Sequence, residues 1–308
     1  MPAHSDLDIR MKENYEKRNR SYLTRRTPVI IRIDGRAFHT FTKGFAKPYD
    51  KLLMQTMQET MKFLCENIQG CVLGYTQSDE ISLLLIDYAK LESDAWFDYQ
   101  IEKVCSISAS MATLEFNRVF SFEAFDTSTL NAGNLYHRFN SKEDFYTEDY
   151  SDIWDSIEKY ELVDLYLNNR EAFIDIVDAH AASEAEGAMF DSRCFNIPPD
   201  EVTNYFYSRQ IDATRNSIQM AAQTYFSAKE LHGKNQNKMQ DMLHEQKGIN
   251  WNDYCTDFKR GSCCKKEQYE FENEDGSITL RSRWVIDHNI PKFSGEGREY
   301  IEKLLRFE

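Results

Sequence analysis

The stretch CVLGYTQSDEISLLLID, residues 71–87, decides how the sheet of this chain is built. Two apolar runs, 71–76 and 81–87, are joined by a polar segment that contains Ser78 and Asp79. Turn-forming residues between two β-rich runs predict a hairpin of antiparallel strands. Such a hairpin disfavours a doubly wound parallel sheet, in which strands alternate with helices.

The segments around the hairpin complete an α+β order. A helix over 7–24, a strand over 28–34 and a helix over 49–67 precede it, and a helix over 96–120 follows. This order, α, β, α, β, β, α, predicts an antiparallel or mixed sheet with helices over one face. Later patterns predict a return strand, two helices and a last strand at 190–198, 200–226, 235–246 and 281–293.

The net charge of −14 is concentrated in one segment. Residues 141–188 hold 14 acidic and three basic residues, a net charge of −11, which leaves −3 for the rest of the chain. We interpret 131–187 as an acidic helical insertion into a main domain formed by 1–130 and 188–308. Since the main domain is close to neutral, the overall acidity does not exclude a nucleic-acid substrate. We expect the insertion to lie away from bound RNA, because its charge repels phosphates.

The composition indicates a cytoplasmic protein without a membrane anchor. No run of about eighteen apolar residues is present, and the N-terminal segment is polar rather than signal-like. Seven cysteines are scattered without a CxxC pair. An odd number at irregular spacing predicts reduced thiols rather than disulfides or a zinc site.

Two acidic residues stand where predicted strands end. Asp34, followed by Gly35, ends the first strand, and Asp79, followed by Glu80, lies in the hairpin turn. These ends can lie side by side in an α+β sheet, and paired carboxylates then favour a bound cation. Oxygen ligands suit Mg²⁺, and two such ions stabilise an in-line displacement at phosphorus. The sequence therefore predicts a Mg²⁺ site, with cations around it that suit a triphosphate: Arg32, Arg36, Lys43 and Lys47.

The carboxylate pattern by itself leaves alternatives open. An aspartate after a strand is also a common turn or capping residue, and Asp-Gly is a common turn dipeptide. Polymerase-like palms and nucleotide cyclases share this pattern, so a cyclase-type domain without an RNA substrate is one alternative. The basic residues of 7–24 and the segment FKRGSCC, 258–264, favour RNA binding.

The motifs read in order resemble the tRNA(His) guanylyltransferase superfamily, and within it the guanylyltransferase-like 3′-to-5′ polymerases. The resemblance covers about 10–125 and 188–300. It rests on RIDGRAFHTF, GFAKPYD, GYTQSDEISLLL, KVCSISAS, FDSRCFNIP, YFYSRQIDATRNSI, GINWNDY and FKRGSCC. It implies a palm-like fold similar to that of nucleotide polymerases, two Mg²⁺ ions, ATP, GTP and other NTPs as substrates, tRNA as partner, and a homotetramer.

The resemblance also implies roles for individual residues. The catalytic residues are Asp34, Asp79 and Glu80, and the metal ligands are Asp34, Asp79 and the carbonyl of Gly35. Nucleotide contacts are expected at Gly35, Arg36, Ala37, Phe38, His39, Lys47, Asp50, Ser78, Lys103, Ser106 and Ser110. We expect RNA contacts at Arg18, Arg25, Arg26, Arg215, Asn216, Lys238 and Lys259.

The implied reaction is activation of a tRNA 5′-monophosphate by ATP or GTP, followed by attack of the 3′-hydroxyl of an incoming NTP. The eukaryotic tRNA(His) enzymes carry HINNLYN, a motif tied to anticodon recognition, where this chain has ATRNSIQ at 213–219. We therefore expect templated repair of tRNA 5′ ends, with addition of a single G to tRNA(His) as the alternative. A second departure is Tyr49, which stands where the family's KPND motif has asparagine.

Overall fold

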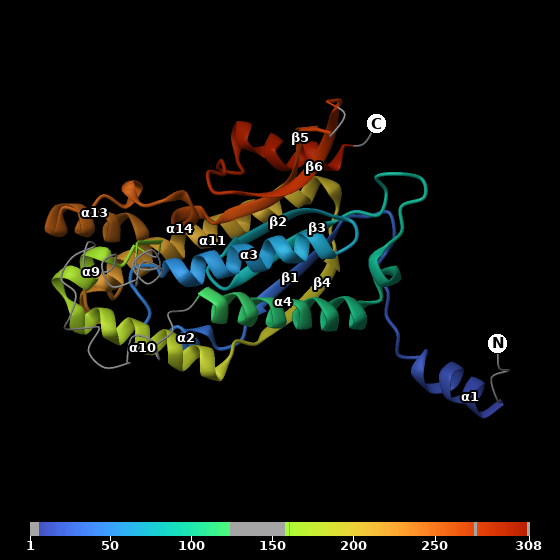
Figure 1. Cartoon of the computed structure of the whole chain (residues 1–308), viewed down its shortest axis with the longest axis horizontal. Coiled ribbons are helices and arrows are strands. Elements are labelled where there is room, and N and C mark those ends of the chain that lie inside the picture. The colour runs from blue at the N-terminus through green and yellow to red at the C-terminus, as the bar shows by residue number, and fades with distance from the viewer. Residues whose placement is uncertain (1–5, 124–157, 160, 274–275, 307–308) are drawn as a thin grey trace.

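One six-stranded antiparallel sheet forms the centre of the molecule (Figure 1). The structure is a computed structural model that describes residues 6–123, 158–159, 161–273 and 276–306. The strand order is β4-β1-β3-β2-β5-β6. In chain order the strands are β1 (Val29–Gly35), β2 (Cys71–Gln77), β3 (Glu80–Leu85), β4 (Phe190–Asn196), β5 (Ser262–Glu272) and β6 (Ile278–Asp287). The predicted α+β class and the hairpin are confirmed.

Three long helices pack on the sheet: α3 (Lys51–Asn67) and α4 (Ile101–Glu123) on one face, and α11 (Pro199–Tyr225) on the other (Figure 1). The strands carry apolar side chains on both faces of the sheet. Ile31 and Ile33 of β1 belong to the core under α3 and α4, whereas Ile30 belongs to the core under α11. Helices therefore cover both faces of the sheet rather than the one face that the element order predicted.

The remaining helices are short or lie at the ends of the sheet. They are α1 (Asp6–Met11), the π-helix η1 (Lys12–Glu16), α2 (Phe38–Phe41), the 3₁₀ helix η2 (Trp96–Tyr99), α9 (Val163–Asn168), α10 (Arg170–Glu186), α12 (Ala228–Leu231), α13 (Gln236–Lys247), the 3₁₀ helix η3 (Trp251–Asp253), α14 (Thr256–Arg260), the 3₁₀ helix η4 (Gly295–Arg298), α15 (Glu299–Glu302) and the 3₁₀ helix η5 (Lys303–Leu305). In the part of the chain that the structure describes, no helix is both long enough and apolar enough to cross a membrane.

The predicted helix over 7–24 is too long, since helical structure ends at Glu16. The following residues pair with a distant segment instead. The Leu23 amide donates to the Tyr99 carbonyl at 3.0 Å, and the Ile101 amide donates to the Ser21 carbonyl at 2.9 Å. These tertiary backbone hydrogen bonds replace those that a continued helix would make, and they override the local helical pattern.

The described part of the acidic insertion is helical, as predicted. Leu162, Tyr166 and, on α10, Phe173 and Val177 are buried in the same core as α3 and α4. This part of the insertion is therefore packed into the main domain. Residues 131–157 and Tyr160 of the predicted insertion lie outside the described residues.

Strand β5 was not predicted from the sequence. It pairs with β2, with Gly74 opposite Cys264, and along its whole length with β6. Most of β5 is charged or polar on both sides, so it lacks the apolar alternation that marks a half-buried strand. The last strand was predicted at 281–293, and β6 begins and ends several residues earlier.

Candidate active site

The end of β1 lies beside the hairpin turn between β2 and β3. In the sheet register, Asp34 is opposite Glu80 on one side and opposite Asp191 on the other. The Gly35 amide donates a hydrogen bond to the Asp79 carbonyl at 3.0 Å. The structure thus brings together residues 34, 35 and 78–80, which we call the acid turn.

Three arginines from different elements surround the carboxylates of the acid turn. Arg32 Nη2 lies 2.6 Å from Glu80 Oε2 and 3.2 Å from Asp34 Oδ2. Arg209 Nη1, on α11, lies 3.4 Å from the same Glu80 oxygen. Arg193 Nη2, on β4, lies 3.9 Å from Asp34 Oδ2. Arg32 therefore neutralises carboxylates, although the sequence suggested that it suits a triphosphate.

Asp79 and Glu80 differ in how their charge is balanced. Burial, and to a smaller extent the nearby charge of Asp34, raises the pKa of Asp79, against hydrogen bonds from its own amide and Ser78. Burial also raises the pKa of Glu80, but the charges of Arg32 and Arg209 oppose this shift. Among the ion pairs of the described residues, none joins Asp79 to a cation. Asp79 is therefore the carboxylate of the turn without a direct ion pair, and the charge of Arg32 offsets only part of the effect of burial.

The acid turn fits a magnesium ion by the chemistry of its donors. Two carboxylates, Asp34 and Asp79, and the Gly35 carbonyl are hard oxygen donors, and Mg²⁺ commonly binds one or two carboxylates together with phosphate oxygens and water. A cation would also relieve the repulsion that helps to raise the pKa of Asp79. Residues 6–123, 158–159, 161–273 and 276–306 contain no group of three or more His, Cys, Asp or Glu side chains arranged for a metal. A metal ion here would therefore be bound partly by these protein oxygens and partly by phosphate oxygens of a nucleotide.

Gly35 has a packing reason to be glycine. A Cβ atom at this position would lie 2.2 Å from Cδ2 of Phe38, so any side chain would displace the phenyl ring. The ring of Phe38 packs against Phe41, Phe116 and Phe190 with centroid distances of 5.1–5.6 Å. Since this ring belongs to the core, Phe38 offers a nucleotide only its backbone.

The other predicted nucleotide contacts after β1 divide into exposed and buried groups. The side chains of Arg36, His39 and Lys47 are exposed, and Ala37 has a positive φ of 55°. Asp50 instead is buried at the start of α3. Its carboxylate accepts hydrogen bonds from the Ala46 and Leu53 amides, both at 3.0 Å, and pairs with His180 Nε2 at 2.9 Å. The structure encloses this carboxylate within the protein.

The predicted contacts on α4 lie on its exposed side. Lys103 Nζ is 5.6 Å from the centroid of the Phe97 ring. The hydroxyls of Ser106 and Ser110 donate to carbonyls of the preceding turn, at 3.4 and 2.8 Å. Helix α4 packs on the sheet face opposite α11, and within the described residues these side chains make no hydrogen bond or ion pair with Asp34, Asp79 or Glu80.

The predicted RNA contacts differ in their exposure and in whether the protein already pairs their charge. Arg25 pairs with three acids, Asp87, Asp94 and Asp98, at 3.0–3.3 Å. Arg215 pairs with Asp212 at 3.3 Å. Exposed positions are Arg18, Arg26 and Lys238. Lys259 bonds to the Asn252 carbonyl and lies 5.7 Å from the Trp251 ring, and burial lowers its pKa.

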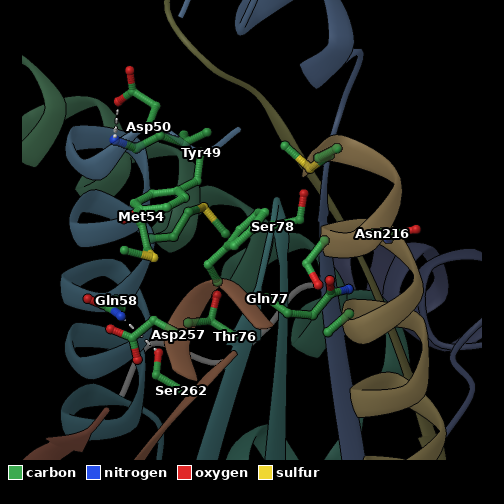
Figure 2. A pocket seen from close by; sticks show the side chains of 16 residues that line it. Tyr49, Asp50, Met54, Gln58, Thr76, Gln77, Ser78, Asn216, Asp257 and Ser262 are labelled. Carbon is green, nitrogen blue, oxygen red and sulfur yellow. Dashed lines mark hydrogen bonds between the residues drawn. The ribbon is translucent and has the colours of Figure 1, made fainter. Parts of the chain in front are cut away.

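A pocket opens next to the acid turn (Figure 2). Gln77 and Ser78, at the end of β2, and Asn216, on α11, lie across from Tyr49 and Met54, at the start of α3. The pocket combines apolar and aromatic walls with a few polar groups, which is typical of a small-molecule site. Asn216, predicted as an RNA contact, lines this pocket together with Ser78.

Two residues of these networks were missed from the sequence: Arg209 and His180. Arg209 lies one helical turn after Tyr205, whose hydroxyl is 2.9 Å from Ser82 Oγ on β3. The i, i+4 spacing of a tyrosine and an arginine was the available signal for a polar stripe facing the sheet. His180 is a lone histidine in an acidic helix, and no local pattern marks it.

Comparisons with known proteins identify the family and the fold. A family model described as tRNAHis guanylyltransferase matches residues 9–198. The solved structure of a bacterial tRNA(His) guanylyltransferase-like protein in complex with ATP is 38% identical, with a TM-score of 0.70, and the match covers 98% of this chain and 100% of that chain. Its GTP complex matches with 36% identity and a TM-score of 0.69. A probable tRNA(His) guanylyltransferase of Dictyostelium discoideum is 26% identical over 274 residues, 84% of each chain.

Proposed function

The chain belongs to the tRNA(His) guanylyltransferase family of nucleotidyltransferases, and we propose that it adds nucleotides in the 3′-to-5′ direction to the 5′ ends of tRNAs. The observation that carries the proposal is the acid turn, where Asp34 and Asp79 lie together and Asp79 makes no direct ion pair with a cation of the described residues. The bacterial relative in complex with ATP or GTP supports nucleoside triphosphates as substrates.

The proposed reaction consists of two in-line displacements at phosphorus. First, an oxygen of the tRNA 5′-monophosphate attacks the α-phosphorus of ATP, and pyrophosphate leaves. Second, the 3′-hydroxyl of the incoming NTP attacks the 5′-phosphorus of the activated tRNA, and AMP leaves. Such displacements depend on positioning and on charge stabilisation, so they need no protein nucleophile.

Residues of the acid turn would bind the metal ion and offset the charges of the reacting groups. Asp34, Asp79 and the Gly35 carbonyl would bind Mg²⁺, which when bound offsets the charge of the phosphates. Glu80 would not be a ligand, because Arg32 and Arg209 already hold its carboxylate. The exposed cations Arg36 and Lys47 would bind phosphate oxygens.

Templated repair, rather than addition of one G to tRNA(His), follows from residues 213–219. The sequence ATRNSIQ lies on α11, where the eukaryotic tRNA(His) enzymes carry HINNLYN. Without that motif, we infer that the opposite strand of the acceptor stem selects the added nucleotide by base pairing. Two further parts of the proposal are a cytoplasmic location, which the scattered cysteines favour, and a homotetramer, which the family resemblance implies. Light scattering of the full chain tests the second.

The test uses a 5′-monophosphorylated tRNA that lacks its first nucleotide, together with ATP, labelled NTPs and Mg²⁺. We expect the wild-type protein to restore the missing base pair. If instead only intact tRNA(His) gains a single G, the single-addition reaction is the correct one. If neither RNA changes, the assignment of a tRNA 5′-end polymerase is wrong.

A further inference from the structure

The acidic insertion contacts the loop that follows the acid turn. This loop, residues 41–51, joins α2 to α3 and carries the exposed Lys47; we call it the nucleotide loop. On the insertion side, the hydroxyl of Ser183 donates to the Phe41 carbonyl at 2.6 Å, at one end of the loop. His180 pairs with Asp50 at 2.9 Å, at the other end. One helix, α10, therefore holds both ends of the loop.

The contact between His180 and Asp50 has a defined donor. Asp50 Oδ2 already accepts the Ala46 amide, and Oδ1 accepts the Leu53 amide. Both amides are donors, so the carboxylate acts as acceptor and His180 Nε2 donates the third hydrogen bond. The side chains of the pair are 1% and 4% exposed, so water does not compete for this bond. The His180 ring also packs edge-on against Phe45, at 4.5 Å between centroids.

A second set of contacts comes from Glu161, just before α9. Its carboxylate is 3.2 Å from Lys51 Nζ and accepts a hydrogen bond from the Tyr49 hydroxyl, also at 3.2 Å. Burial, together with the charges of Cys255 and Glu161, raises the pKa of Tyr49, so the phenol keeps its proton and can donate. Tyr49 stands where the family motif has asparagine, and it is long enough to reach the insertion.

Two lysines of the nucleotide loop, Lys47 and Lys51, differ in whether they form an ion pair. Glu161 neutralises Lys51, whereas Lys47 takes part in no ion pair of the described residues and its side chain is exposed. The position of Lys47 relative to the acid turn depends on how the loop is held, since Lys47 lies between Ala46, which donates to Asp50, and Asp50 itself.

We propose that His180 is a positioning residue through which the acidic insertion sets the nucleotide loop, and with it Lys47, for binding of a nucleoside triphosphate. The inference rests on the proposed function, because the loop has this role only if the acid turn binds nucleotides. The hydrogen bonds from the Ala46 and Leu53 amides would be enough for Asp50 to cap α3. His180 adds the bond that ties this cap to a helix of the insertion.

The test compares His180→Leu, which removes the donor and keeps an apolar side chain, with His180→Gln, which keeps an N–H donor. Equilibrium dialysis with ATP and Mg²⁺ gives the Kd for nucleotide, and filter binding gives the Kd for tRNA. We expect His180→Leu to weaken ATP binding about tenfold, since misplacing a binding group by an ångström costs factors of this size or more. The variant should raise KM for ATP more than it lowers kcat, and leave the tRNA Kd within about twofold. His180→Gln should recover most of the ATP affinity.

The matched control is Asp178→Asn, which changes an exposed residue of the same helix and should leave the Kd for ATP unchanged. If His180→Leu does not fold, Glu161→Gln replaces it; its side chain is 54% exposed, and its loss should weaken ATP binding a few-fold. A folded His180→Leu, or in its place Glu161→Gln, that binds ATP like the wild type overturns the inference. Equal weakening by Asp178→Asn overturns it as well. A wild-type protein that binds no ATP refutes the proposed function itself.

Discussion

Asp50 and Asp79 are both aspartates at the boundary of a regular element, but their carboxylates have different surroundings. Asp50, at the start of α3, is 6% exposed and takes hydrogen bonds from the Ala46 and Leu53 amides and from His180. Asp79, in the turn between β2 and β3, has no ion pair to a cation within the described residues, and burial raises its pKa. The first carboxylate is stabilised by the protein, and the second is destabilised by it.

The difference separates two roles that the sequence does not distinguish. A buried carboxylate that accepts hydrogen bonds from two backbone amides and a histidine holds the chain in place and is shielded from a ligand. A carboxylate that is partly buried, lies beside another carboxylate and lacks a counter-charge gains most from a bound cation. By this criterion, we propose that Asp79 serves the chemistry and that Asp50 serves the loop, although both belong to motifs of the family resemblance.

The largest effect that tests this comparison is the loss of activity in Asp79→Asn. Removing one group that stabilises charge in an active site typically costs about 10²–10³-fold in rate, so we expect that loss in 5′-end extension. The measurement is single-turnover extension of the truncated tRNA. Glu80→Gln is the control, because Arg32 and Arg209 hold its carboxylate, and we expect a loss below about 10²-fold. Equal losses in the two variants would mean that adjacent acids share one role.

Replacing Asp50 should instead reduce stability. Asp50→Ala removes the cap of α3, worth about 1 kcal/mol, and leaves the buried His180 donor without a partner, at about 1–3 kcal/mol more. Urea unfolding should therefore show a total loss of about 2–4 kcal/mol. Asp178→Ala, at an exposed position, should stay within about 0.5 kcal/mol of the wild type. An Asp50→Ala protein that is as stable as the wild type but inactive would reverse the role assigned here.

The elements of this comparison differ in how far the sequence predicts them. The hairpin and the acid turn follow from short-range patterns, because alternation and turn residues are local properties. The partners of the same carboxylates do not. Arg209 and Glu80 are 129 positions apart, and His180 and Asp50 are 130 positions apart. Only the packing of α10 and α11 brings these side chains together, so spacing along the chain carries no signal for them.

Contacts with distant segments also explain why the bounds of a predicted helix were wrong. The helix predicted over 7–24 stops at Glu16 because Ser21 and Leu23 bond to the backbone around Tyr99. A distant partner decides the outcome. Helix propensity is a local property of the sequence and does not take such a partner into account.

A smaller effect concerns the stability of the metal-free protein. Since the pKa of Asp79 is raised in the folded state, that state binds a proton more tightly than the unfolded state. The contribution of Asp79 is therefore most favourable at pH values below its ordinary pKa of 3.8 and is lost as pH rises through the folded-state pKa. Asp79→Asn removes the cost of the charge, so we expect a higher Tm than the wild type at neutral pH without divalent cations. The difference should shrink toward pH 4.

Added Mg²⁺ sharpens this measurement. A cation that binds the folded wild type stabilises it by mass action, so MgCl₂ should raise the Tm of the wild type more than that of Asp79→Asn. Equal responses would show that Asp79 does not bind the ion. A wild type that is already more stable than Asp79→Asn without divalent cations would contradict the idea that its charge is unbalanced.

The smallest effect applies the same comparison to two arginines that the sequence predicts as RNA contacts. Arg25 is held by Asp87, Asp94 and Asp98, and its pKa is raised by hydrogen bonds to Asp94 and Asp87. Arg18 is exposed and has no ion pair among the residues that the structure describes. If a cation already paired within the protein is unavailable to phosphate, only Arg18→Ala should change tRNA binding. The slope of log Kobs against log salt should fall by about 0.9 for one lost contact to duplex phosphate, with a loss of affinity of a few-fold, whereas Arg25→Ala should leave the slope unchanged. A reduced slope in Arg25→Ala would mean that RNA displaces its three acidic partners, and that pairing within the protein does not decide which charges are available to a ligand.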